Sequence, residues 1–359
     1  MWYPVAVAQL LPPVSTAGLR RSPRVPGGSH ANRRTGGMRT RPRASRRTLL
    51  SAAAAAVLAG SDGCAEEPDY PPGPLRIASG GVGGVYYAYA QGIETVVHTA
   101  LSRLRPAVLP TAASVENLRL VSAGRAEIGF TSADAAADAF LGRTPFAEAL
   151  PVLALGRIYE DYLHLVVRKD RHIGRVADLR GHRISIGAPG SGTELISGRL
   201  LSVAGLPLTA LHAERLSPGV AAEAVRTGQL DGMIFSGGIP TAAIATLAHQ
   251  VPIVLLELGN LVPGLRERFG EVYVERTIPA STYGLGVPTV TFGIANYLVV
   301  VRSMDSRVAY RVTRALFEHR DLLAAAHPEG SRLDRGAAIS TEPLPLHPGA
   351  ARYYREAKR

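Results

Sequence analysis

From residue 75 onward, short runs of apolar and β-branched residues alternate with segments of helical periodicity, and this alternation restricts the chain to an α/β fold. Strands are predicted at 75–79, 107–111, 126–132, 163–169, 182–188 and 231–235. The intervening helices are predicted at 85–104, 114–122 and 193–203. In α/β sheets, ligands bind at the carboxyl ends of the strands. The binding site is therefore expected at the junctions between strands and helices.

The last part of the chain continues this alternation with longer elements. Residues 289–302 are predicted to form a long strand rich in β-branched residues, and 307–326 a strongly periodic helix. A proline-rich acidic linker, 65–74, precedes the first strand. The fold is therefore expected to begin at residue 75.

Four of the strand-to-helix junctions share one chemical device. Each places glycines or a Ser or Thr hydroxyl where a helix begins, in segments 80–84, 113–117, 187–194 and 236–240. The free N–H groups of a helix N-terminus, with a hydroxyl beside them, hold a carboxylate or another small anion. One such junction is ordinary turn and capping chemistry. Four together, without a catalytic set, favour a binding cleft.

The glycine cluster at 80–84 does not fit a nucleotide-binding loop. A G-x-G-x-x-G fingerprint that starts at Gly81 ends on Tyr86, and one that starts at Gly80 meets Val82 at its third position. The strand at 107–111 ends without an acid for a ribose, and no G-K-S/T triplet is present. The tyrosine pair at 86 and 87 instead suggests an aromatic wall or lid over a small solute, with core packing as the alternative for the second tyrosine.

Catalytic and metal-binding patterns are missing, so no enzymatic activity, metal or cofactor is expected. Ser191 lies in a G-S-G triplet, but Pro189 occupies the position where a nucleophile elbow has its first glycine. His164 lies inside an apolar strand, which favours a packed or hinge histidine over a general base. Glu160 and Asp161 are interpreted as a solvated turn, because adjacent residues on a turn usually point apart. No H-x-x-H or H-E-x-x-H spacing offers a metal site.

Residues 1–64 are predicted to be an export signal region. They hold ten arginines and one acid, whereas the rest of the chain holds 30 basic and 28 acidic side chains. This nearly neutral body argues against a nucleic-acid-binding surface. The segment SRRTLL at 45–50 resembles a twin-arginine export motif, and an alanine-rich run too short to span a bilayer follows it. Met38 is an alternative start of the chain.

The only cysteine, Cys64, follows the apolar run. Lipid modification of this cysteine would anchor the mature protein to a membrane. A free cysteine in the tail of a signal peptide is the alternative, because Asp62 departs from the small residues that a lipoprotein signal requires. With no other cysteine, residues 65–359 have no disulfide and no thiol chemistry.

Several segments resemble the TAXI-type solute receptors of TRAP transporters. They are GGVGGVYYAYAQGI, SVENLRLVSAGRAEIGFTSADAA, VRKDRHIGRVADLRGHRISIGAPGSGTE, DGMIFSGGIP and HPGAARYYRE, and the similarity covers about residues 75–357. The resemblance implies an α/β, two-lobed periplasmic-binding-protein type II fold with a ligand cleft between the lobes. Lobe 1 is expected at 75–163 and 296–359 and lobe 2 at 164–295, with two hinge strands joining them.

The resemblance also implies an exported, extracytoplasmic receptor, periplasmic or at the cell surface. Such a receptor catches a small organic acid or amino acid, glutamate-like or another carboxylate, and delivers it to a TRAP-type membrane permease. Its motifs place these residues at the ligand: Gly81, Val82, Gly83, Gly84, Tyr86, Ser114, Asn117, Ser132, Ser191, Gly192, Thr193 and Gly237. No motif fixes an arginine as a carboxylate clamp, and Arg157 and Arg168 are candidates. Thr111–Ala113 and Thr131 depart from the residues common in relatives, so the polar contacts to the solute are expected to differ.

Two other functions remain open. A ligand-sensing protein for a membrane signalling partner would use the same cleft with a different docking partner. A transferase on the same fold would need a general base or a covalent anchor in the cleft. A neighbouring gene for a multi-span permease would favour transport, and one for a sensor kinase would favour sensing.

Overall fold

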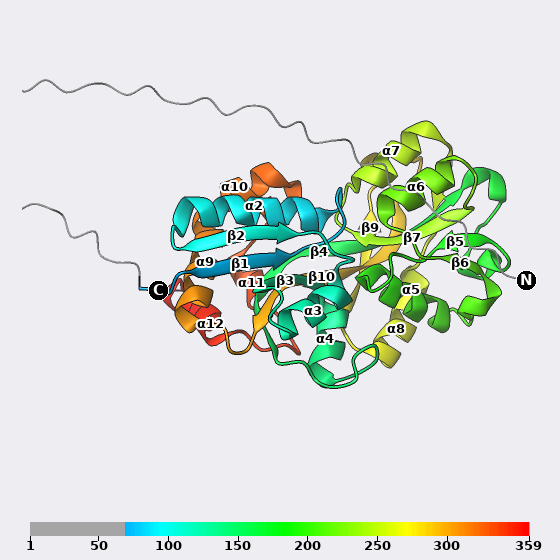
Figure 1. Ribbon diagram of the computed structural model, residues 1–359. Helices are drawn as coiled ribbons and strands as arrows, with labels where there is room; N and C mark the ends of the chain where they lie inside the picture. The colour runs from blue at the N-terminus through cyan, green and yellow to red at the C-terminus, as the bar shows by residue number, and fades with distance from the viewer. Residues whose placement is uncertain (1–68, 359) are drawn as a thin grey trace, which may run out of the picture. The chain divides into compact units, whose positions relative to one another are not determined.

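The computed structural model describes residues 69–358, which form a mixed β-sheet with helices on both of its faces (Figure 1). The strands are β1 (Gly73–Ala78), β2 (Leu104–Leu109), β3 (Ile128–Ser132), β4 (Val152–Arg168), β5 (Arg183–Ser185), β6 (His212–Glu214), β7 (Gly232–Gly237), β8 (Ile253–Leu255), β9 (Tyr273–Ile278) and β10 (Thr289–Val301). The helices are α2 (Val85–Ala100), α3 (Ser114–Ser122), α4 (Ala133–Leu141), α5 (Gly192–Val203), α6 (Pro218–Arg226), α7 (Ala242–Gln250), α8 (Val262–Phe269), α9 (Ser306–Glu318), α10 (Arg320–Ala326), α11 (Arg335–Ala338) and α12 (Pro348–Glu356).

The sheet consists of two halves with the same arrangement of strands. One half has the order β2-β1-β3-β10 and the other β6-β5-β7-β4. In each half the three short strands are parallel and the long strand next to them is antiparallel. The short strands β1–β3 with α2–α4 and α9–α12 form lobe 1, and β5–β9 with α5–α8 form lobe 2, while β4 and β10 run through both. The predicted α/β fold with two lobes is therefore confirmed.

The long strands β4 and β10 connect the lobes. They pair antiparallel from Val152 opposite Val301 to Tyr162 opposite Gly293. Strand β10 also pairs with β3 and β9, and β4 also pairs with β7 and β8. The register of this ladder shifts beside Asn296, between residues 296 and 297, and again between 298 and 299. The sheet thus passes from one lobe to the other through paired backbone rather than through loops.

The prediction of a turn at Glu160 and Asp161 was wrong, because both residues lie inside β4. This strand was predicted to begin only at residue 163, because the charged residues at 157–161 interrupt the apolar pattern. Arg157 and Arg276 offset the charge of Glu160, at 3.0 and 2.8 Å. Asp161 is buried. Successive side chains of a strand point to opposite faces, so the two acids have different surroundings.

Several element ends also differ from prediction. The helix expected at 85–104 ends at Ala100, and β2 begins earlier than expected, at Leu104. The helix expected at 307–326 divides into α9 and α10 at His319. The predicted junction at 236–240 ends directly before the N-cap of α7, Thr241. These differences leave the predicted strand-to-helix junctions in place.

The packing joins the lobes as well as filling each of them. One buried apolar cluster fills lobe 1 between α2, α9 and the sheet, and a smaller one lies in lobe 2 around α6 and α7. The largest cluster crosses from α3 and α4 to α5 and α8. Within residues 69–358, no helix combines the length and apolar character needed to cross a membrane.

A buried ion-pair network lies where these lobes meet, and we call it the Arg199 network. Arg199 of α5 pairs with Asp138 of α4 and lies 3.6 Å from the Asp134 carboxylate. It also donates to the Tyr273 hydroxyl of β9 at 2.7 Å and stacks over the Phe269 ring at 4.7 Å. Burial nevertheless raises the pKa of Asp138 to about 6, and Arg199 opposes that rise. The cation and both carboxylates thus hold α4 against α5.

Candidate functional site

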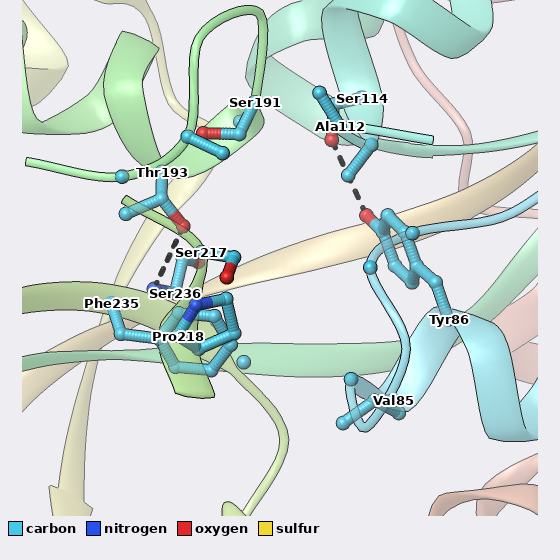
Figure 2. A pocket seen from close by; sticks show the side chains of 18 of the residues that line it. Val85, Tyr86, Ala112, Ser114, Ser191, Thr193, Ser217, Pro218, Phe235 and Ser236 are labelled. Carbon is cyan, nitrogen blue, oxygen red and sulfur yellow. Dashed lines mark hydrogen bonds between the residues drawn. The ribbon is translucent and has the colours of Figure 1, made fainter. Parts of the chain in front are cut away.

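A cavity of about 100 Å³ lies where the carboxyl ends of the short strands of both lobes converge (Figure 2). Residues from six strand-to-helix junctions line it, three from each lobe: those after β1, β2, β3, β5, β6 and β7. A buried water needs at least roughly 10–15 Å³ of such space. The cavity therefore has room for a small organic molecule, and not for a dinucleotide.

Nine of the twelve residues predicted at the ligand line this cavity. They are Gly81, Gly84, Tyr86, Ser114, Ser132, Ser191, Gly192, Thr193 and Gly237. Val82 and Gly83 line a neighbouring surface hollow instead, and Val82 is 74% exposed. Asn117 is buried beneath the cavity and is not part of its lining.

Asn117 fixes the ends of three strands beneath the cavity. Its amide nitrogen donates to the carbonyl of Ser79 after β1 at 2.6 Å and to that of Phe130 in β3 at 2.8 Å. The hydroxyl of Thr111, after β2, donates to its amide oxygen at 2.6 Å. Asn117 therefore positions the junctions of lobe 1 rather than contacting the cavity itself.

Tyr86 forms a wall of the cavity on the lobe 1 side. Its ring packs on Phe130, with 4.9 Å between ring centroids, and its hydroxyl donates to the side-chain oxygen of Asn296. The Ser114 hydroxyl lies 3.4 Å from the Tyr86 hydroxyl and accepts from the Ser132 amide at 3.1 Å. The Ser132 hydroxyl is buried and lacks a hydrogen-bond partner. A polar group that is buried without a partner is costly, so this hydroxyl is suited to bonding a ligand.

In four helices that begin at the cavity, the side chain of the N-cap residue makes no hydrogen bond to the first turn. They are α2, α3, α4 and α6, and each has at least nine residues. The first N–H groups of a helix have no partner within the helix and attract negative charge. Together with the unpartnered Ser132 hydroxyl, these N-termini make the cavity suitable for an anionic group.

On the lobe 2 side of the cavity, side-chain hydroxyl groups accept hydrogen bonds from backbone amides. The Ser191 hydroxyl caps α5 by accepting from the Glu194 amide at 3.0 Å, and the Thr193 hydroxyl accepts from the Ser236 amide at 3.2 Å (Figure 2). Each hydroxyl hydrogen is left to donate to an oxygen of a ligand. Gly187 has a φ of +101°, and a Cβ there would lie 2.7 Å from Thr193, so this tight turn requires glycine.

The two lobes touch beside the cavity. A Cβ on Gly192 of lobe 2 would lie 2.7 Å from the Ser114 hydroxyl and 3.1 Å from the Ser132 hydroxyl of lobe 1. The Glu116 amide of α3 also donates to the Gly190 carbonyl at 3.2 Å. Ser114, Ser132 and the start of α5 therefore come close enough to act on the same small molecule.

Asp161, which was not predicted at the ligand, lines the cavity from β4 and is 5% exposed. One of its oxygens accepts from the Ser236 hydroxyl at 3.3 Å, and the other has no hydrogen-bond partner. Burial raises the pKa of Asp161 to about 7, although Tyr159, Ser236 and Asn296 act in the opposite direction, and the charge of nearby Glu329 adds to the rise. No sequence motif marks this aspartate.

The junction between β6 and α6 was also missed. Ser217 and Pro218 line the cavity, with Ser217 at the N-cap and Pro218 as the first residue of α6. A serine before a proline is a common helix start, so this signal was available in the sequence. Phe235 of β7 contributes a further apolar surface.

Neither candidate arginine lies at the cavity. Arg157 pairs with Glu160 at 3.0 Å, and Arg168 pairs with Asp170 at 2.7 Å. Asp161 is the single charged residue among the described residues that line the cavity. A ligand there thus meets amides, hydroxyls and one carboxyl group, but no cationic side chain.

His164 is a packed histidine, as the sequence predicted. Its ring is buried between the Tyr283 hydroxyl at 2.8 Å and the Phe235 carbonyl at 3.3 Å. Burial lowers the pKa of His164 to about 4. Among residues 69–358, no group of three or more His, Cys, Asp or Glu side chains is arranged to hold a metal ion.

Two similar lobes with a cavity at facing strand ends define a ligand-binding class of α/β protein. The chain belongs to the NMT1-like family, whose model matches residues 77–357. Similar solved structures include the periplasmic aliphatic sulphonate binding protein SsuA from Escherichia coli, with 17% identity and a TM-score of 0.45 over 79% of this chain and 83% of that one. An ancestral arginine-binding protein bound to arginine has 12% identity and a TM-score of 0.46, over 72% and 99% of the two chains. The ligands in these descriptions are those of the proteins described.

Proposed function

We propose that the chain is an extracytoplasmic solute receptor that binds a small carboxylate and delivers it to a TRAP-type membrane permease. The observation that carries this proposal is the convergence of six strand-to-helix junctions on one small cavity. Uncapped helix N-termini and the hydroxyls of Ser132, Ser191 and Thr193 supply donors for an anion. The TRAP assignment rests on the resemblance to TAXI-type receptors.

Binding is proposed to close the two lobes around the solute. We place lobe 1 at 75–163 and 296–359 and lobe 2 at 164–295, with β4 and β10 as the hinge. Gly192 of lobe 2 lies against Ser114 of lobe 1, so a closed arrangement brings donors from both lobes to the ligand. Hinge closure of this kind is a common way to enclose a small molecule.

A sensing protein for a membrane kinase is the second candidate, because it would use the same cavity. A transferase is less well supported. Asp161 is the one buried acid that lines the cavity within the described residues, and His164 is packed away from it. An enzyme of this kind would lose turnover, rather than affinity, when cavity residues are changed.

The proposed export signal, the twin-arginine motif and the lipidation site Cys64 lie outside the described residues. Arg46→Lys combined with Arg47→Lys is expected to block export, because it removes the paired arginines that define the motif. Cell fractionation with an antibody to the chain would measure this. Normal export of the double variant would mean that another pathway carries the protein.

Calorimetry with the full-length chain would test the central proposal. The protein would first be unfolded and refolded to remove any solute carried through purification, and then titrated with monocarboxylates, dicarboxylates and amino acids. Saturable binding of an acid without turnover is expected. Turnover of a bound acid would favour the transferase, and failure of every carboxylate to bind would reject the proposed receptor.

A further inference from the structure

The inference concerns the chemical class of the solute, and it rests on the proposed receptor function. We propose that the solute is an α-amino acid with a neutral side chain, whose ammonium group pairs with Asp161 while its carboxylate binds the helix N-termini and hydroxyls. Asp161 would then determine specificity for amino acids over other organic acids.

The first observation is the unmet hydrogen-bonding capacity of Asp161. It lines the cavity, is 5% exposed, and has one carboxylate oxygen without a partner. A buried carboxylate in this condition gains from a further donor, and a cationic donor also offsets its charge, which the neutral groups around it cannot do. The remaining residues of the lining provide no cation. An ammonium group on the ligand supplies both the donor and the charge.

The second observation is that the polar groups around Asp161 that favour its ionised form carry no charge of their own. The Ser236 hydroxyl donates to its second oxygen at 3.3 Å, and the Tyr159 hydroxyl and Asn296 amide also favour its ionised form. Tyr86 fixes Asn296 by donating to its side-chain oxygen. Asn296 in turn lies opposite Ser132 in the ladder of β3 and β10, which places the Asp161 region next to donors for an anion. A small ligand that carries both an ammonium group and a carboxylate would fit these two neighbouring regions, the first at Asp161 and the second at the donors near Ser132.

The third observation concerns the ligand side chain. Apolar groups form much of the cavity wall: Val85, Ala113, Leu216, Pro218, Met233 and Phe235. A second ligand carboxylate, as in a glutamate-like solute, would have no cationic side chain to meet. A second ammonium group on the ligand would have no carboxylate to pair with, because Asp161 already pairs with the first. A neutral, mainly apolar side chain is the group that this wall accommodates.

The test compares ligands that differ in one group. The refolded full-length chain would be titrated calorimetrically with alanine, valine, leucine and glutamate, and with the 2-hydroxy acids that match the first three. Losing one partner of a desolvated charge pair typically costs at least roughly 30-fold in affinity. At least one neutral amino acid is therefore expected to bind roughly 30-fold or more tightly than its 2-hydroxy acid, and more tightly than glutamate.

Asp161→Asn tests the same pair from the protein side. This variant is expected to lose roughly 30-fold in affinity for the amino acid while its affinity for the 2-hydroxy acid changes less than about threefold. Glu160→Gln is the matched control, because it removes the neighbouring carboxylate, which pairs with Arg157 and Arg276 away from the cavity. Its amino acid affinity should be unchanged, and thermal unfolding would verify that both variants fold.

The outcomes separate this inference from the function on which it rests. Equal binding of an amino acid and its 2-hydroxy acid would overturn the ammonium site and leave the carboxylate receptor standing. Tighter binding of glutamate than of every neutral amino acid would overturn the inference that the side chain of the solute is neutral. Failure of both acid series to bind would reject the receptor itself. If Asp161→Asn does not fold, the ligand pairs measured on the unchanged protein still decide the question.

Discussion

Two buried aspartates in this molecule have opposite surroundings. Asp138 lies between α4 and α5 with the Arg199 guanidinium as its partner, whereas Asp161 lies at the cavity with one oxygen unpartnered. Burial raises the pKa of both, to about 6 for Asp138 and about 7 for Asp161. The first charge is met within the protein and joins two helices. The second is not met within the protein, and its partner is therefore sought in the ligand.

The largest effect is expected when the internal partner is removed. Arg199→Met removes the cation that pairs with the buried carboxylates of Asp134 and Asp138, and it should lower the free energy of unfolding by about 3 kcal/mol at pH 8. The loss should be smaller at pH 5, because the Asp138 carboxyl group, whose pKa burial raises to about 6, can then take up a proton. Denaturant unfolding at both pH values measures this. Arg175→Met, at an exposed salt bridge, is the control and should change stability by less than about 0.5 kcal/mol.

If Arg199→Met changes stability no more than the control does, the Arg199 network is not what joins the lobes. Asp138 would then have no demonstrated role in holding the lobes together, and its comparison with Asp161 would not stand.

At the cavity, removing the buried charge is expected to raise the free energy of unfolding instead of lowering it. The folded-state pKa of Asp161, about 7, lies above the ordinary value of 3.8, so its contribution to stability is fully present below pH 3.8 and is lost as the pH rises to about 7. Asparagine does not titrate. Without ligand, Asp161→Asn should therefore be more stable than the unchanged protein by about 1–3 kcal/mol at pH 8, and the difference should shrink at pH 5.

Thermal and denaturant unfolding across pH 5–8 would measure the difference between these two proteins. A variant that is less stable at pH 8 would show that the Asp161 carboxylate already has a sufficient partner in the ligand-free protein. The gain in stability with loss of amino acid binding would mark Asp161 as a residue kept for function at the expense of stability.

The hydroxyls of lobe 2 should affect ligand affinity more than the fold. Ser191→Ala combined with Thr193→Ala is expected to weaken carboxylate binding by about 1–3 kcal/mol, through loss of hydrogen bonds to a charged group. Calorimetry with the best ligand measures this, and loss of the α5 cap accounts for about 1 kcal/mol of stability. Unchanged affinity would mean that these two hydroxyls do not bind the ligand.

The smallest effect is expected from a single added methyl group. Gly192→Ala would place its Cβ 2.7 Å from the Ser114 hydroxyl, so the two lobes would have to separate slightly. Ligand affinity should fall by about 1 kcal/mol, with little change in unfolding, because overpacking confined to a contact between lobes strains the closed form. Gly198→Ala, on the same helix with open space around its Cβ position, is the control. Equal affinities in both variants would mean that the lobes need not meet here.

The sequence predicted the parts of this site that depend on local chemistry. Glycines and hydroxyls recur at the start of four predicted helices, so the junctions that hold Gly81, Ser114 and Ser191 could be located without a structure. Asn117 was placed in the right region but with the wrong role. Its bonds to Ser79 and Phe130 depend on how three strands align, which local sequence does not encode.

Asp161 could not be predicted for a related reason. Its neighbours Ser236 and Asn296 are more than seventy residues away in the chain, and strand pairing alone brings them together. The charged residues around it also concealed the strand. The arginine candidates failed because Glu160 and Asp170 satisfy Arg157 and Arg168 locally.

The shared strands β4 and β10 set the physical character of any motion between the lobes. Because no flexible linker connects the lobes at these crossings, rotation must be absorbed as torsion of a hydrogen-bonded ladder, and the register shifts beside Asn296 are where that ladder is least regular. Torsion of paired strands orders few new dihedral angles, so closing costs little chain entropy. Amide hydrogens of this ladder should therefore exchange more slowly when a solute is bound. Hydrogen exchange in β4 and β10 would then report whether the cavity is occupied.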